Sequence, residues 1–242
     1  MVMAKLAWTF TITRNHYIEN KAVTDCMKTR DRILAAALDL FNQQGERNVT
    51  TNHIAAHLEM SPGNLYYHFK NKQEIIYELF LSYESTVDNN LNVPAGRQLT
   101  IADKLNYLQK VFQGLWEYRF IHRDMEHLLV ADQRLHARYR TFFRRCQKKT
   151  EAIYQGLHDS NIINIEQGEL EGLALNTWIV VTSWFSFLQC NLLSDSEQSI
   201  TLDMLKGGIY QIFQLERPYL TDQYREEVQA MQEAFIPKPD WL

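Results

Sequence analysis

The stretch from Thr51 to Lys72 limits the fold more than any other part of the chain, because it holds two short apolar patterns with a break between them. The first pattern places three apolar residues on one helical face: Ile54, Ala55 and Leu58. Met60 follows in the break, and Leu65 and Phe69 then form an i, i+4 pair that a second helix would bury on one side. The stretch therefore predicts two short helices joined by a tight turn, which is a helix-turn-helix unit.

Signals for helix starts and ends frame this unit. Residues 30–44 form an amphipathic helical pattern that ends at Gly45, a residue typical of helix C-termini. Thr51 is expected to cap the following helix with its hydroxyl and to hold a phosphate at that helix N-terminus. Ser61 and Pro62 form the next start signal, with Ser61 as the cap and Pro62 at the first helical position, where its missing N–H costs nothing. We therefore predict a brace helix followed by two short helices.

This order of residues resembles a known family. An apolar helix, a glycine, Thr-Thr-x-x-Ile-Ala, a turn and the run Gly-Asn-Leu-Tyr-Tyr-His-Phe-Lys-Asn-Lys are similar to the N-terminal DNA-binding domain of the tetracycline-repressor-like (TetR) family of bacterial regulators. The resemblance covers roughly residues 28–80. It implies that Thr51 caps a helix and touches phosphate and that Lys72 caps the unit against a phosphate. It implies DNA contacts by Thr51, Ser61, Gly63, Asn64, Tyr66, Tyr67, His68 and Lys72.

The chemistry of these side chains also suits duplex DNA. Tyrosine hydroxyls, the Lys72 ammonium and a helix N-terminus bind phosphate oxygens, which position a protein without reading the base sequence. Asn64 can pair bidentately with adenine and His68 can donate to a guanine edge, so these two are the candidates for base recognition. Alternatively, Tyr66 or Tyr67 packs partly in the core. Basic and acidic residues alternate around the unit, so tight binding requires that they segregate onto different faces.

The composition of the chain limits which groups can bind nucleic acid and which cellular compartment suits the protein. The 242 residues carry a net charge of −4, so any nucleic-acid binding must come from local groups and not from an overall positive field. Cys26, Cys146 and Cys190 are far apart and lack CxxC spacing, which argues against a disulfide framework or a zinc ribbon and favours the reducing cytoplasm. Residues 1–26 are expected to be a flexible arm or an upstream extension without a signal peptide, and Met27 is the expected natural start.

Helical periodicity continues through the rest of the chain, and no strand pattern appears. Helices are expected at residues 73–90, 100–120, 131–159, 166–193, 199–215 and 221–235. We predict an all-α fold with an N-terminal three-helix helix-turn-helix domain and a C-terminal helical domain for ligand binding and dimerisation. The predicted divisions are residues 1–26 (arm), 27–73 (DNA-binding domain), 74–236 (effector-binding and dimerisation domain) and 237–242 (tail).

Three of these segments carry further predictions. Residues 166–193 are apolar nearly all round, but polar residues interrupt the run, so a buried core helix that also meets a partner subunit is favoured over a membrane span. With residues 199–215, where Gly207 and Gly208 allow close helix approach, it is expected to form a four-helix dimer interface. Residues 131–159 are rich in arginine and lysine; a solvated helix face is the main interpretation, and a second nucleic-acid or anion-binding surface is the alternative.

Metal and enzyme chemistry find little support. His53 and His57 are spaced i, i+4, but no third metal ligand is in view. A second group of polar residues is denser but is more typical of solvated side chains than of a metal site; it consists of His122, Asp124, Glu126, His127, Asp132 and His136. No GxSxG, GxGxxG or Walker loop occurs. We therefore predict that the chain is not an enzyme and needs no metal or cofactor.

Together with the resemblance, these patterns predict a homodimeric, ligand-responsive transcriptional regulator, most naturally a repressor. Two-fold symmetry would place the paired recognition helices about one DNA turn apart and would require a near-palindromic operator. A small apolar or aromatic effector is expected to bind among aromatic residues of the C-terminal domain, each of which could instead be core packing: Phe112, Trp116, Tyr118, Trp178, Trp184 and Phe185. The alternative is a DNA-binding architectural or adapter protein without an effector.

Overall fold

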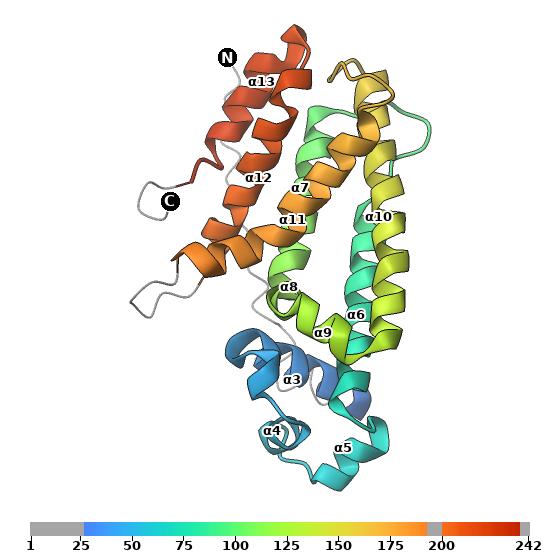
Figure 1. The fold of residues 1–242 in the computed structure, drawn as a ribbon, viewed down its shortest axis with the longest axis vertical. Coiled ribbons are helices and arrows are strands. Elements are labelled where there is room, and N and C mark those ends of the chain that lie inside the picture. Colours follow the sequence, from blue (N-terminus) through green and yellow to red (C-terminus); the bar gives the residue numbers. More distant parts are fainter. Residues whose placement is uncertain (1–26, 193–199, 238–242) are drawn as a thin grey trace. The chain divides into compact units, whose positions relative to one another are not determined.

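The computed structural model describes residues 27–192 and 200–237. The predictions for the arm at residues 1–26 and for the tail beyond Pro237 lie outside the described residues. The chain divides into two compact units between Ile75 and Ile76, and each unit is described by itself (Figure 1). Within the described ranges every regular element is a helix, apart from one isolated antiparallel bridge between Ile163 and Leu220. The all-α prediction is confirmed.

The first unit is a small cluster of short helices. It consists of α3 (Thr29–Gln44), a 3-10 turn η1 (Glu46–Asn48), α4 (Thr51–His57), α5 (Pro62–His68) and the start of α6 (Lys72–Asn90). Its centre is formed by apolar side chains that are at most 1% exposed, namely Ile33, Ala37, Phe41, Val49, Ile54, Leu65 and Phe69. These residues come from α3, α4 and α5 and from the positions directly after η1 and α5, so burying them holds the two short helices against the brace helix.

Local signals set the ends of these helices. Gly45 ends α3 with a φ of 89°, a conformation that a residue with a Cβ adopts only at a cost. Ser61 Oγ accepts a hydrogen bond from the Asn64 N–H, and Pro62 occupies the first turn of α5, so the predicted start signal is confirmed. The turn between α4 and α5 contains Glu59 in the left-handed region, with a φ of 54°.

The second unit is a bundle of longer helices (Figure 1). After α6 come α7 (Ile101–Glu117), the short helices α8 (Arg119–Arg123) and α9 (Met125–Ala131), α10 (Gln133–Asp159), α11 (Leu170–Leu192), α12 (Leu202–Glu216), η2 (Arg217–Tyr219) and α13 (Asp222–Glu233). Helix α11 packs against both α10 and α12, and α12 packs against α7. Helix α7 starts with a capping box between Thr100 and Asp103.

Three of the expected helix boundaries are wrong. The helix predicted from residue 199 begins as α12 at Leu202. The segment predicted to run to residue 120 ends as α7 at Glu117, because the chain turns at Tyr118 and restarts as α8. The helix predicted from residue 166 begins at Leu170. Residues before it instead pair with η2, where the Asn164 N–H donates to the Tyr219 carbonyl. These are tertiary contacts, which a periodicity pattern does not contain.

Aromatic rings fill the centre of the second unit between α6, α10 and α11. The Phe142 ring lies 5.6 Å from the Phe80 ring, 5.7 Å from the Tyr83 ring and 5.9 Å from the Trp178 ring, all edge to face. The predicted close approach at Gly208 is confirmed, because a Cβ at this position would lie only 2.6 Å from the Phe112 ring.

Candidate nucleic-acid interface and ligand pocket

Helix α5 presents a polar outer face because two buried residues hold it from behind. Leu65 is 0% exposed and Phe69 is 1% exposed, and both point into the core of the first unit. The residues before and between them are exposed, apart from a half-buried His68. The exposed ones include five of the predicted DNA-contact residues: Ser61, Gly63, Asn64, Tyr66 and Tyr67. This short helix therefore offers amide and phenol groups to a partner without giving up its own packing.

The two tyrosines differ in their roles within the unit. Tyr67 is 84% exposed, so the alternative that it packs in the core is wrong. Its ring lies edge to face with the His68 ring, with the ring centroids 5.2 Å apart. Tyr66 is 47% exposed and its hydroxyl lies 3.0 Å from the Thr51 hydroxyl. That hydrogen bond joins α5 to the N-terminus of α4 and places two hydroxyls side by side at one helix end.

The predicted capping role of Thr51 is wrong, because the residue before it does the capping. Thr50 Oγ1 accepts a hydrogen bond from the His53 N–H, and His53 Nδ1 accepts one from the Thr50 N–H. The two residues form a capping box in which histidine replaces the usual Glu or Gln. A Thr-x-x-His spacing was the available sequence signal. Thr51 is thus free of capping and bonds to Tyr66 instead.

Lys72 faces inward and not toward a partner. Its ammonium donates to the carbonyls of Glu46 and Val49, at 3.0 and 3.1 Å, and pairs with Glu46 Oε1 at 2.6 Å. An ammonium has three N–H donors, and these acceptors use all three. This arrangement is at odds with the predicted phosphate contact. Lys72 acts as a positioning residue that ties the start of α6 to η1.

Neither histidine set forms a metal site in the structure. His53 serves the capping box, and His122 is buried with its Nε2 3.0 Å from the Tyr83 hydroxyl. Burial lowers the pKa of His122 to about 4, so its ring is neutral at physiological pH. Within the described ranges no three His, Cys, Asp or Glu side chains come close enough to hold a metal ion together.

A cavity of about 80 Å³ lies in the second unit among α6, α7, α10, α11 and the end of α12. Its walls are largely apolar or aromatic, with Tyr83, Tyr107, Leu108, Ile153 and Trp178 among them. Of the six predicted effector-binding residues, Trp178 alone lines this cavity. The others are placed elsewhere: Phe112, Tyr118, Trp184 and Phe185 are buried in the core, and Trp116 is half-buried beneath the Arg119 guanidinium.

One side of the cavity is polar, and sequence reasoning missed it. Lys104 from α7 forms an ion pair with Glu216 from α12, and the two side chains are only 4% and 3% exposed. The Tyr154 hydroxyl donates to Glu216 Oε1 at 2.8 Å and lies 2.6 Å from the Thr177 hydroxyl. Four helices thus contribute one polar side chain each. No local signal marks these residues, because they are scattered along the chain and meet only in the fold.

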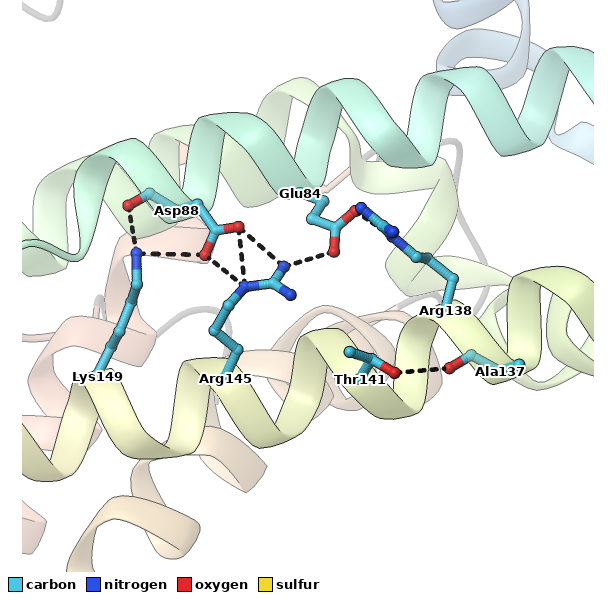
Figure 2. Close-up of polar contacts among 7 residues, drawn as sticks. All are labelled: Glu84, Asp88, Ala137, Arg138, Thr141, Arg145 and Lys149. Atoms are coloured by element: carbon cyan, nitrogen blue, oxygen red, sulfur yellow. Dashed lines mark hydrogen bonds and ion pairs between the residues drawn. The ribbon is translucent and has the colours of Figure 1, made fainter.

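A second polar cluster joins α6 to α10 (Figure 2). Glu84 accepts hydrogen bonds from Arg138 Nε, at 2.7 Å, and from Arg145 Nη2. Asp88 accepts from Arg145 Nε at 3.0 Å, and Lys149 donates to the Asp88 carbonyl at 2.6 Å. We call these five residues the α6–α10 ladder. Burial would raise the pKa of Asp88, but hydrogen bonds from Arg145 and Lys149 outweigh it and lower the pKa.

The ladder corrects the prediction that the basic residues of α10 form a solvated face. Three of them, Arg138, Arg145 and Lys149, pair with acidic residues of α6. Arg140, Arg144 and Lys148 lie on an exposed face, as predicted.

Comparison with known proteins now identifies the family. The model described as "Bacterial regulatory proteins, tetR family" matches residues 33–79, and the model described as "Bacterial transcriptional repressor" matches residues 82–228. The chain belongs to the TetR family. It is accordingly a DNA-binding transcriptional regulator of the repressor type, in a family of regulators and not of enzymes.

Individual relatives agree with this assignment. A TetR-family regulator from Marinobacter aquaeolei VT8 is 50% identical, with a TM-score of 0.81 over 87% of this chain and 100% of that one. QacR of Staphylococcus aureus is 42% identical over 59 residues, which span 24% of this chain and 31% of QacR. SmeT in complex with triclosan is 18% identical, with a TM-score of 0.56 over 87% of this chain and 96% of that one, and shows the fold alone.

Helix α11 of this TetR-family chain has an apolar exposed face. Within the described ranges it is the one helix whose length and apolar composition would suffice to cross a membrane, over Leu170–Asn191, a test that core helices of soluble proteins also pass. Leu175, Ile179 and Phe187 are 40%, 51% and 42% exposed. Their spacing places them near one side of α11, where these large apolar side chains are partly exposed to solvent.

Proposed function

We propose that this TetR-family regulator is a cytoplasmic homodimeric repressor that binds a near-palindromic operator through α5 and leaves it when a small effector enters the cavity of the second unit. The observation that carries the proposal is the outer face of α5. A buried Leu65 and Phe69 fix this helix, while Asn64 and a Tyr67 that is 84% exposed face away from the core.

The roles on this surface follow from chemistry. Asn64 suits bidentate pairing with adenine, and His68 suits donation to a guanine edge. The paired hydroxyls of Thr51 and Tyr66, at 3.0 Å, suit phosphate oxygens, as does the Tyr67 hydroxyl. Lys70 is exposed directly after α5 and adds a cation to the same surface. Ser61 and Gly63 stand at the N-terminus of α5, where the backbone can approach DNA closely.

Dimerisation is supported by the exposed apolar face of α11. Three large apolar side chains exposed on one side of a helix are costly in water, and a second copy of the chain would cover them. Helices α11 and α12 pack together, so two copies would form a four-helix interface. Sedimentation at micromolar concentration is expected to give the mass of a dimer, and a monomeric mass would contradict this part of the proposal.

Effector release is supported by the cavity. A volume of about 80 Å³ holds several water molecules but is small for a ligand of drug size, so a larger effector would have to move the walls apart. Tyr83 and Val87 of α6 belong to those walls, and α6 begins at Lys72 of the first unit. An effector can shift the protein from its DNA-binding form only if it binds the two forms with different affinities.

Selection from random DNA followed by substitution tests the DNA-binding part. The variant Asn64→Ala, Tyr67→Ala, His68→Ala is expected to bind the selected site at least about 100-fold more weakly, since each good base or phosphate contact contributes about 1–3 kcal/mol. The matched control is Gln43→Ala, Gln44→Ala, which changes exposed residues at the end of α3 and should bind as the wild type does. Unchanged affinity in a folded triple variant would refute the proposed interface.

A further inference from the structure

The chemistry of the cavity narrows the class of effector that it accepts. This inference rests on the proposed function, because it concerns the same pocket. The cavity wall combines a large apolar and aromatic surface with one polar corner, formed by Lys104, Glu216, Tyr154 and Thr177. The apolar part of the wall favours an apolar body in the ligand, and the polar corner decides what its polar group has to be.

The charges of the polar corner already cancel. Lys104 and Glu216 form an ion pair with each other, and their side chains are 4% and 3% exposed, so the corner is neutral and shielded from water. A ligand that brought a carboxylate or an ammonium group into the cavity would leave one net charge buried without a counter-charge, which is strongly unfavourable. The corner therefore favours an uncharged ligand over an anion or a cation of the same shape.

The hydrogen bonds of the corner leave donor capacity on Lys104. Tyr154 donates its hydroxyl hydrogen to Glu216 Oε1, so the Thr177 hydroxyl donates to Tyr154, and both hydroxyl hydrogens are used. Glu216 Oε1 accepts from Tyr154 and Oε2 pairs with Lys104. The Lys104 ammonium has three N–H donors, but its partners are Glu216 Oε2 and the face of the Phe213 ring, 4.4 Å from Nζ.

We propose that the effector is an uncharged, largely apolar molecule with a hydrogen-bond acceptor, such as a carbonyl oxygen, that binds to the Lys104 ammonium. The acceptor takes up an N–H that otherwise has no oxygen acceptor among the described residues. Tyr107 and Trp178 then contact the apolar body of the molecule. Glu216 keeps its ion pair and Tyr154 keeps its hydrogen bond, so binding leaves the buried charges balanced.

Four probes with the same number of non-hydrogen atoms separate the possibilities. Acetophenone carries the acceptor, isopropylbenzene replaces it by a methyl group, benzoate carries a negative charge, and 1-phenylethylammonium carries a positive charge. Dissociation constants are measured for the full chain by ligand-observed NMR titration. Acetophenone is expected to bind about tenfold or more tightly than isopropylbenzene and more tightly than either ion, because a hydrogen bond from a charged donor is worth at least this factor.

Variants at Lys104 and Glu216 test whether the preference for acetophenone arises at the polar corner. Lys104→Met alone would leave Glu216 buried and unpaired, so the variant used is Lys104→Met, Glu216→Gln, which keeps the corner neutral. In this double variant the advantage of acetophenone over isopropylbenzene is expected to fall below about threefold, while the affinity for isopropylbenzene stays within about threefold of wild type. The matched control is Lys110→Met, an exposed lysine on the same helix, which should leave all four affinities unchanged.

Several results would overturn the inference. They are equal binding of the ketone and the hydrocarbon by the wild type, tightest binding of an ion, a ketone advantage that survives in the double variant, and no binding of acetophenone. Release of operator DNA is measured in parallel. If a compound releases DNA from the wild type and the double variant alike, this inference is wrong and the proposed function stands. If acetophenone binds at Lys104 but no compound releases DNA, the proposed function is wrong and this inference stands.

Discussion

The α6–α10 ladder allows a comparison between two neighbouring arginines on one helix. Arg145 pairs with Glu84 and Asp88 (Figure 2). Arg144, the next residue before it, is exposed on another face of α10. Arg145→Gln and Arg144→Gln change the net charge, helix propensity and side-chain length in the same way. The difference between them therefore measures what the contacts with α6 contribute to the stability of the second unit.

The expected magnitude follows from burial. Arg145 makes charge-assisted hydrogen bonds to two carboxylates, each worth about 1.5–3 kcal/mol where water is excluded. The Arg145 side chain is 34% exposed, and Asp88 keeps Lys149 when Arg145 is lost, so solvent screening reduces the sum to about 2 kcal/mol. Arg144→Gln is expected to change the free energy of unfolding by less than about 0.5 kcal/mol.

A third and a fourth variant test the shared carboxylate. Glu84 is 4% exposed and is paired with both Arg138 and Arg145, so either arginine alone still neutralises it. Arg138→Gln alone is expected to cost about 1 kcal/mol, since its side chain is 44% exposed. The variant Arg138→Gln, Arg145→Gln leaves Glu84 buried without a cation and is expected to cost more than the sum of the single variants, by about 1 kcal/mol.

The assay is urea denaturation followed by tryptophan fluorescence, because Trp116, Trp178 and Trp184 lie in the second unit and report on its unfolding. Circular dichroism at a helix wavelength checks that both probes give the same midpoint, which a two-state analysis requires. Equal free energies of unfolding for the Arg144 and Arg145 variants would refute the argument. Strict additivity of the two substitutions around Glu84 would refute the shared pairing.

Three further predictions concern packing, capping and protonation. Gly208→Ala is expected to destabilise the protein by about 1–3 kcal/mol, because its Cβ would lie 2.6 Å from an aromatic ring. Gly172→Ala on α11 meets nothing within 4 Å and should stabilise the protein by about 0.5–1 kcal/mol. Urea denaturation midpoints that shift in the same direction for both variants would contradict this. Ser61→Ala removes the α5 cap and is expected to cost about 1 kcal/mol, seen as faster amide hydrogen exchange in α5, and unchanged exchange would argue against the cap. Burial lowers the pKa of His122 from 6.5 to about 4, so the unfolded chain binds a proton in this window that the folded protein does not. The free energy of unfolding therefore falls by about 3 kcal/mol between pH 6.5 and pH 4, and His122→Gln should remove this part of the slope in denaturation curves measured across the window; a variant with the wild-type slope would show that His122 is not its source.

The parts of the fold that were predictable from the sequence are those that depend on neighbours in the chain. Gly45 ends α3, Ser61 caps α5, and Thr100 with Asp103 caps α7, because each of these contacts joins residues at most a few positions apart. The outward direction of Asn64 and Tyr67 was predictable for the same reason, since the i, i+4 pair behind them fixes the face of the helix. Even here a local rule failed once, when Thr50 and not Thr51 took the cap.

The ligand pocket was not predictable because aromatic content does not distinguish a wall from a core. The local sequence does not distinguish Phe112 from Trp178. Phe112 is 0% exposed where α7 packs against α12, whereas Trp178 of α11 lines the cavity. Lys104 and Glu216 are single charged residues on two helices that are far apart in the sequence, and nothing in the local sequence of either one indicates a partner. Their pairing exists only after α7 and α12 come together.

The ion pairs of the α6–α10 ladder could be predicted from the sequence only in part. The basic residues of α10 fall into two helical stripes, one with Arg138, Arg145 and Lys149 and the other with Arg140, Arg144 and Lys148. Glu84 and Asp88 of α6 are spaced i, i+4, the spacing that a matching acidic stripe requires. The sequence alone therefore shows two equally good partners for the acidic pair. What selects one is that Phe142 and Cys146, both at most 1% exposed, turn the first stripe toward the core and toward α6. The choice of ion pair is thus a consequence of where the apolar side chains of α10 are buried, and a substitution that moves that apolar face would exchange the paired and the solvent-facing arginines together.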